Sequence, residues 1–278
     1  MTTKPVEVDE GRQSAKKYSI CTLVTNRDVY ENMTNKFISA GFTADVANYI
    51  YVDNTGYNKY DGYEGVRRLI ESTAGDYIII CHEDVEPIDT IDQLENCIAQ
   101  LDTIDPQWAF CGNAGGIAMG KLAIRITDPK GKNRNIGGPF PRKVMNLDEN
   151  FILTKKSTSL TPSRDLEGFH FYGTDVCLQG FLKGWNSYVI DFHLRHEGGA
   201  SRTKRSTKAT DRHLEFHNSF VKAKNRIIDK YSLLLGPMWI QTPNARLFIC
   251  RNRVLRFLGN RKIVCSIVRR IVSICSRN

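Results

Sequence analysis

Three short apolar segments, separated by two segments of helical pattern, occupy the first third of the chain and constrain its fold most strongly. The apolar segments are 18–25, 47–52 and 76–81, and the intervening 29–41 and 63–72 place apolar residues on one face of a helix. Strands and helices that alternate over short links favour a parallel sheet covered by helices. The sequence therefore predicts an α/β fold built on such a sheet.

Each apolar segment is followed by polar side chains at the point where the predicted strand ends. Asn26 follows the first strand, Asp53 follows the second, and His82, Glu83 and Asp84 follow the third. The carboxyl ends of parallel strands meet at one edge of the sheet, and ligands bind in the crevice beyond that edge. These polar groups therefore predict a binding cleft there.

The stretch DYIIICHEDVEP brings an imidazole and two carboxylates to the end of the third strand. Such groups suit a hard divalent cation together with phosphate oxygens. Side chains two residues apart share a face of an extended strand, so His82 and Asp84 are expected to act together. Glu83 turns away and is expected to matter least. A solvated loop of charged residues is the alternative interpretation.

A further imidazole, His196, follows a strand expected over 186–192 and precedes two glycines, which permit close backbone approach to a ligand. The basic stretch RTKRSTK comes soon after and suits a diphosphate. A structural histidine and a surface run of charges are the alternative interpretations of these two features.

A glycine-rich stretch, GNAGGIAMGK at 112–121, follows a short strand expected over 108–111. It is too rich in glycine for an ordinary strand or helix, so we expect irregular structure there. Its GK is followed by Leu122 rather than by Ser or Thr, which argues against a phosphate-binding P-loop.

Charge and cysteine usage narrow the function classes. The chain has a net charge of +9, and residues 251–278 carry eight Lys or Arg and no Asp or Glu, which leaves +1 for the rest (9 − 8). A near-neutral body without an aromatic stacking platform argues against a nucleic-acid partner. Eight cysteines, none in a CxxC pair and most within apolar runs, indicate buried reduced thiols in a cytoplasmic protein.

The two ends of the chain differ from its body. Residues 1–17 are polar and are expected to form a flexible leader. Residues 246–278 are expected to form a basic amphipathic C-terminal extension, because 261–277 place Ile and Val on one half of a helix and basic residues on the other. Such a helix is typical of peripheral binding to an anionic membrane, here on its inner face, and docking on the protein body is the alternative. No apolar run approaches the roughly 18 residues of a membrane span.

Four motifs, in order, resemble a branch of the family 2 glycosyltransferases that has HxDV in place of the usual DxD. They are HEDV at 82–85, LDENF at 147–151, GFHFYGTDVCL at 168–178, and a segment from GW at 184–185 to HEGG at 196–199. The resemblance implies a GT-A (Rossmann-like) domain over 18–245, with a mixed, mostly parallel sheet flanked by helices and followed by the basic amphipathic helical tail.

The same resemblance implies an activity and a set of site residues. The activity is metal-dependent transfer of a sugar, with inversion, from a nucleotide-diphosphate sugar to a hydroxyl of a glycan or lipid-linked acceptor, in surface polysaccharide or glycoconjugate biosynthesis. Asp84 and His196 would hold Mn²⁺ or Mg²⁺. The nucleotide sugar would contact Thr25, Asn26, Asp53, Asn54 and His82, and the acceptor would face Asp148, Glu149 and His170.

Three carboxylates are candidates for the catalytic base, and the sequence does not decide between them. Much of the wider family places an acid two residues before the position of Asp175, and here that position is Gly173. Asp175, Asp148 and Glu149 are all candidates, and a helix-capping or core role is the alternative for Asp175. A chain that has lost its base would be a non-catalytic nucleotide-sugar or glycan-binding relative, which is the alternative function.

Overall fold

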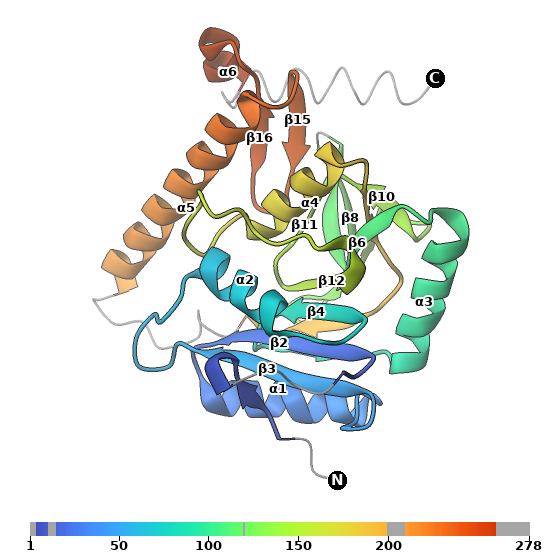
Figure 1. Ribbon diagram of the computed structural model, residues 1–278. Helices are drawn as coiled ribbons and strands as arrows, with labels where there is room; N and C mark the ends of the chain where they lie inside the picture. The colour runs from blue at the N-terminus through green and yellow to red at the C-terminus, as the bar shows by residue number, and fades with distance from the viewer. Residues whose placement is uncertain (1–3, 11–14, 119, 199–208, 260–278) are drawn as a thin grey trace.

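The computed structural model describes residues 4–10, 15–118, 120–198 and 209–259, and the side chains of all of these except 209–214. Its main sheet has eight strands in the order β1-β3-β2-β4-β12-β6-β13-β10 (Figure 1). Their bounds are β1 Val6–Glu7, β2 Tyr18–Val24, β3 Ala47–Asp53, β4 Tyr77–Cys81, β6 Trp108–Gly112, β10 Arg142–Val144, β12 Phe151–Lys155 and β13 Asn186–Val189. The pairs β1–β3, β3–β2, β2–β4 and β6–β13 are parallel, and β12 runs antiparallel to both of its neighbours.

A second sheet lies at the carboxyl edge of the first. It has the order β11-β7-β8-β14-β5, with β9 paired to β8, and a separate hairpin is formed by β15 and β16. The strands are β5 Val85–Pro87, β7 Ala114–Ala118, β8 Lys121–Thr127, β9 Asn133–Ile136, β11 Asn146–Leu147, β14 Leu194–His196, β15 Met238–Gln241 and β16 Arg246–Ile249. Because β4 leads into β5 and β6 into β7, chain segments that leave the main sheet enter the second one directly.

Among the described residues, five helices flank the main sheet: α1 Arg27–Ser39, α2 Gly62–Ser72, α3 Ile91–Ile104, α4 Tyr172–Leu182 and α5 Ala209–Ser232 (Figure 1). A further helix, α6 Arg253–Gly259, contacts β16 of the hairpin. Side chains alternate along β4, so Ile78 and Ile80 join one core and Ile79 and Cys81 join the other. The first core also holds residues of α2, α4 and α5, and the second holds residues of α1 and α3. Both faces are thus buried, which explains why the inner strands are continuous apolar runs.

The mixed, mostly parallel α/β sheet flanked by helices is the architecture that the GT-A resemblance predicts, so the predicted fold class is confirmed. The first three predicted strands, which are β2, β3 and β4, and the helices between them lie within two residues of their predicted bounds. Six of the eight cysteines lie in the described part of the chain and are free and buried. Within the described residues, no helix has both the length and the hydropathy that a membrane span requires.

Two predicted boundaries coincide with regular structure. Residues 6–10 lie within the predicted flexible leader, yet β1 pairs in parallel with β3 and is followed by a 3-10 turn. The predicted border at 245/246 cuts through a hairpin, because β15 pairs with β16, and Leu247 and Ile249 of β16 are fully buried in a core. The basic amphipathic pattern at 261–277 lies outside the described residues.

The glycine-rich stretch was expected to be irregular, but Ala114–Ala118 forms the strand β7. The backbones of neighbouring segments pack closely against this strand. A Cβ on Gly115 would meet the backbone oxygen of Asn146, and one on Gly116 would meet the backbone oxygen of Gln241 in β15. Glycine therefore lets β11 and the hairpin pack directly against this strand. The hairpin is fastened further by the Gly120 amide, which donates to Oε1 of Gln241 at 3.0 Å.

Candidate active site

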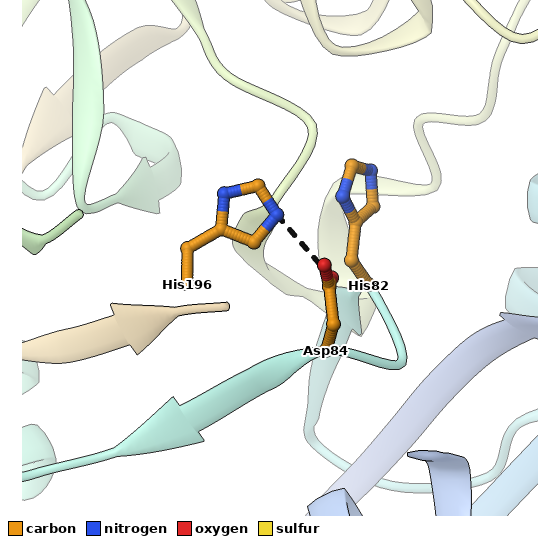
Figure 2. A group of neighbouring side chains, drawn as sticks. All are labelled: His82, Asp84 and His196. Carbon is orange, nitrogen blue, oxygen red and sulfur yellow. Dashed lines mark ion pairs between the residues drawn. The ribbon is translucent and has the colours of Figure 1, made fainter. Parts of the chain in front are cut away.

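Three side chains that could ligate a metal ion meet at the carboxyl edge of the main sheet. His82 and Asp84 lie in the link between β4 and β5, and His196 ends β14, which pairs antiparallel with β5 and sets His196 opposite Val85. Nε2 of His196 lies 3.2 Å from Oδ1 of Asp84, and one ligand atom from each of the three residues lies within 4.8 Å of the others (Figure 2). We call this group the His82–Asp84–His196 cluster.

The cluster has a donor set that fits a divalent cation. Burial lowers the pKa of His196, but the hydrogen bond and the negative charge of Asp84 outweigh it and leave this pKa raised. Burial, and then the nearby His196, lower the pKa of His82, which keeps its imidazole neutral and able to ligate. Two imidazoles and one carboxylate suit Mn²⁺ better than Mg²⁺, which prefers oxygen ligands throughout.

Glu83 turns away from the cluster, as predicted, and its carboxylate makes structural hydrogen bonds. Its carboxylate accepts hydrogen bonds from the backbone amides of Thr25 and Asn26 at 2.7 and 2.9 Å and from the Thr25 hydroxyl at 2.5 Å. These bonds tie the end of β4 to the end of β2. Glu83 therefore positions the edge on which the cluster stands.

The residues assigned to nucleotide binding lie along the same edge, and their polar groups already have partners in the protein. Asp53 accepts from Nη2 of Arg27 at 2.5 Å and from the Thr55 amide and hydroxyl, while Arg27 stacks over Tyr51 at 4.3 Å. The Thr55 bonds, and then Arg27, lower the pKa of Asp53. Asn26 caps α1 through Oδ1, and the buried Asn54 binds the backbone of 59–60.

A cavity of about 380 Å³ brings together the three residues expected to face the acceptor. Asp148 and Glu149 lie in the link between β11 and β12, and His170 lies just before α4. The His82 amide donates to the Asn150 carbonyl at 3.1 Å, so this link runs beside the one that carries the cluster. Asp148 accepts from the Asn150 amide and from its side chain at 2.6 Å, which holds its carboxylate in place.

Glu149 lies at the N-terminal end of α4. Its Oε1 accepts from the Gly173 amide at 3.3 Å, and a Cβ on Gly173 would lie 3.4 Å from the Glu149 Cγ and closer still to Leu147 and Ile152. Glycine at 173 thus leaves room for the Glu149 side chain. Burial, followed by the charge of Asp148, raises the pKa of Glu149 to about 8. A carboxyl with such a pKa can take up and release a proton near neutral pH.

Asp175 lies away from the cavity and is completely buried. Its carboxylate accepts from the Ser163 amide and hydroxyl at 2.7 and 2.8 Å, from Gln179 at 3.0 Å and from the Tyr231 hydroxyl at 2.7 Å. Burial outweighs these bonds and raises its pKa. The bonds join α4, α5 and the loop at 163. The helix begins at Tyr172, so Asp175 lies inside its first turn and does not cap it.

The other wall of the cavity comes from elements that the sequence analysis missed. It is formed by α5 and by the turn between β15 and β16, with the lining residues Phe216, His217, Phe220, Thr242, Pro243 and Asn244. Apolar residues at 220, 223, 227, 228 and 231 have helical spacing and would have predicted α5. No sequence signal connects the hairpin to the site, because its docking depends on Gly116 of a distant strand.

No family model matches the sequence. A protein of Fuscovulum blasticum, "ATP synthase subunits region ORF 6", is 35% identical over 207 residues, which are 72% of this chain and 83% of that protein. The mannosyltransferase PcManGT from Pyrobaculum calidifontis, in complex with GDP-Man and Mn²⁺, aligns with a TM-score of 0.45 and 10% identity over 69% of this chain and 60% of that one. The catalytic domain of Drosophila β1,4-galactosyltransferase 7, in complex with xylobiose, gives 0.41 and 13% over 69% and 75%.

Proposed function

The chain belongs to the family of the Fuscovulum blasticum protein "ATP synthase subunits region ORF 6", and we propose that it is a metal-dependent glycosyltransferase. The observation that carries the proposal is the His82–Asp84–His196 cluster at the carboxyl edge of a mostly parallel sheet, beside a cavity that contains two carboxylates. In this proposal a nucleotide-diphosphate sugar binds at the cluster, and the hydroxyl of a glycan or lipid-linked acceptor enters the cavity.

The proposed mechanism is a direct displacement with inversion. Glu149 takes the proton of the acceptor hydroxyl, whose oxygen forms a bond to the anomeric carbon while the bond from that carbon to the diphosphate oxygen breaks. His82, Asp84 and His196 would hold Mn²⁺, which would supply positive charge beside the departing diphosphate. Asp148, fixed by Asn150, orients the acceptor by accepting a hydrogen bond from a second hydroxyl.

A screen of nucleotide sugars tests the function directly. We expect one nucleoside-diphosphate sugar, together with Mn²⁺, to raise the melting temperature of the full chain by several degrees, because a ligand at about 100 times its Kd adds about 2.7 kcal/mol to the free energy of unfolding. Mn²⁺ should act better than Mg²⁺, and Asp84→Ala should remove the shift. Absence of a shift with any such sugar, with either ion, would contradict the proposal.

The assignment of Glu149 as base predicts a pH dependence. Glu149 must be ionised to accept a proton, and its raised pKa implies that kcat/KM of the free enzyme increases as pH rises toward about 8. Glu149→Gln should lower turnover by about 10²–10⁴-fold and flatten this rising limb. Glu71→Gln, an exposed acid on α2, is the matched control and should change neither. A Glu149→Gln variant with the wild-type rate and pH profile would exclude Glu149 as the base.

The second candidate function is a non-catalytic nucleotide-sugar or glycan-binding protein. Two features favour it. The Asp175 carboxylate is bonded to Ser163 and Tyr231 in the protein interior, and Gly173 stands where the resembled family would place an acid. The screen and the Glu149→Gln variant separate the two functions. A chain that binds the nucleotide sugar and transfers it to nothing, not even to water, is the binding protein.

We also propose that the protein is cytoplasmic and binds peripherally to an anionic membrane through its C-terminal end. Described residues there expose large apolar side chains beside arginines: Leu233 and Leu234 after α5, and Val254, Leu255, Phe257 and Leu258 of α6, which also carries Arg253 and Arg256. Apolar side chains ringed by cations fit the interface of an anionic bilayer. The basic sequence at 260–278 follows α6 in the chain.

Flotation with vesicles tests this binding. We expect the full chain to float with phosphatidylglycerol vesicles and to stay behind with phosphatidylcholine vesicles. Phe257→Asp and removal of 260–278 should each reduce recovery, while Tyr57→Asp, which changes another exposed aromatic residue elsewhere, should not. Equal recovery of all variants with both vesicles would end the proposal.

A further inference from the structure

The cavity beside the cluster has a distinctive charge. Its lining contains two carboxylates, Asp148 and Glu149, and two imidazoles, and none of its described lining residues is Lys or Arg. After burial, the charge of Asp148 is the main cause of the raised pKa of Glu149. Burial lowers the pKa of His170, so this imidazole is neutral at pH 7. A carboxylate or phosphate on a ligand would therefore meet the charge of Asp148, and the described lining residues offer it no Lys or Arg with which to pair.

The opposite wall is aromatic. The His170 ring packs edge-on against Phe216 and Phe220, with centroids 4.8 and 5.3 Å apart, and Phe171 packs against Phe220 at 4.9 Å. Phe216 is nevertheless 61% exposed, although it is held in this group and lines the cavity. An exposed ring in a concave site gains free energy when an apolar surface covers it. One face of a pyranose carries mainly C–H groups and provides such a surface.

The remaining wall is a preformed polar turn. The Thr242 hydroxyl accepts from the amides of Asn244 and Ala245 at 3.2 and 2.7 Å, and Gln241 fastens the hairpin to Gly120. Asn244 stays exposed at the cavity. An amide side chain at this position can bond the hydroxyls of a sugar and adds no charge.

From these walls we propose that the acceptor is an uncharged sugar whose apolar ring face lies on Phe216 while its hydroxyls bond Asp148 and Asn244. The proposal rests on the glycosyl transfer proposed above and specifies its acceptor. It excludes uronic acids and phosphorylated sugars as the residue that receives the new bond. The hydroxyl proton passes to Glu149 and the acceptor oxygen forms the glycosidic bond, so no further reactant is needed.

The test compares acceptors that differ only in charge. The full chain, Mn²⁺ and the donor found in the thermal-shift screen are incubated with p-nitrophenyl glycosides of glucose, galactose, mannose and their N-acetylamino forms. The matched glucuronide and galacturonide are run beside them. We expect at least one neutral glycoside to be extended, with kcat/KM at least about 100-fold above that of its uronide. Release of the nucleoside diphosphate in the absence of acceptor reports donor turnover separately.

The outcomes distinguish failure of the proposed function from failure of the acceptor proposal. If the donor is neither bound nor hydrolysed, the proposed function fails. If the donor is turned over while the uronides are used as well as the neutral glycosides, or while no neutral glycoside is extended, the acceptor proposal is overturned and the transferase remains.

Variants of Phe216 add a second readout. Phe216→Ala should raise KM for the neutral glycoside about tenfold, Phe216→Tyr should restore it, and Phe216→Arg should shift the preference toward the uronide. Val221→Ala changes an exposed apolar residue of α5 outside the cavity and serves as the control with wild-type constants. An unchanged KM in Phe216→Ala would overturn the stacking role. Because Phe216 is exposed, its replacement leaves the fold intact.

Discussion

Replacement of Asp84 by alanine is expected to abolish glycosyl transfer, with a loss of at least about a thousandfold in kcat/KM. Asp84 supplies the carboxylate of the His82–Asp84–His196 cluster, and without it the two imidazoles lose the anionic ligand that would share a dication with them. The fold should persist, because the β4–β5 link is held mainly by Glu83. We therefore expect a melting temperature near that of the wild type in the absence of metal.

Two measurements connect this loss to the metal. Titration of Mn²⁺ followed by its electron paramagnetic resonance should show binding to the wild type and not to Asp84→Ala. The matched control is Glu86→Gln, which removes a neighbouring carboxylate that bonds Asn32 and lies outside the cluster. It should keep both metal binding and turnover. Near-normal transfer by Asp84→Ala, or equal loss in Glu86→Gln, would remove the cluster from the mechanism.

Asp175→Asn is expected to lower stability strongly while the folded fraction keeps its turnover. The amide keeps the shape of the carboxylate but cannot accept from all of Ser163, Gln179 and Tyr231. Buried donors left without acceptors cost about 3 kcal/mol together, which lowers the melting temperature by roughly 6–12 °C in a domain of this size. Thermal unfolding and initial rates, measured well below the transition, separate the two effects.

A milder variant serves as the check on this assignment. Tyr231→Phe removes the phenol that bonds the carboxylate and backbone oxygens of Asp175, and it should cost about 1 kcal/mol with turnover unchanged. If Asp175 is structural, stability should therefore fall from the wild type to Tyr231→Phe and further to Asp175→Asn, while the turnover rate stays the same in all three. A wild-type melting temperature in Asp175→Asn, joined to a loss of turnover, would make Asp175 the base instead of Glu149.

Sequence alone was sufficient for the scaffold wherever a signal was local. The runs of β2, β3 and β4 are apolar on both faces because both faces of the sheet are covered, and their polar ends fall on one edge by the geometry of parallel strands. His82, Asp84 and His196 all lie at strand ends, and the pairing of β14 with β5 brings them together.

What the sequence could not reveal depends on partners distant in the chain. Nothing near Glu83 indicates that its carboxylate holds the end of β2, and nothing near Asp175 indicates that Ser163 and Tyr231 surround it. Asn54 looks like a ligand at a strand end, but its amide folds its own loop. A polar residue at an edge is equally suited to binding a substrate or the backbone, and only the fold decides between them.

The β15–β16 hairpin spans the distance between two proposed surfaces. Its turn lines the cavity, and its other end leads into α6, which exposes the apolar side chains proposed to meet the membrane (Figure 1). Four residues of extended strand measure about 13 Å. If α6 rests on the bilayer as proposed, the length of the hairpin sets the height of the cavity turn above the lipid.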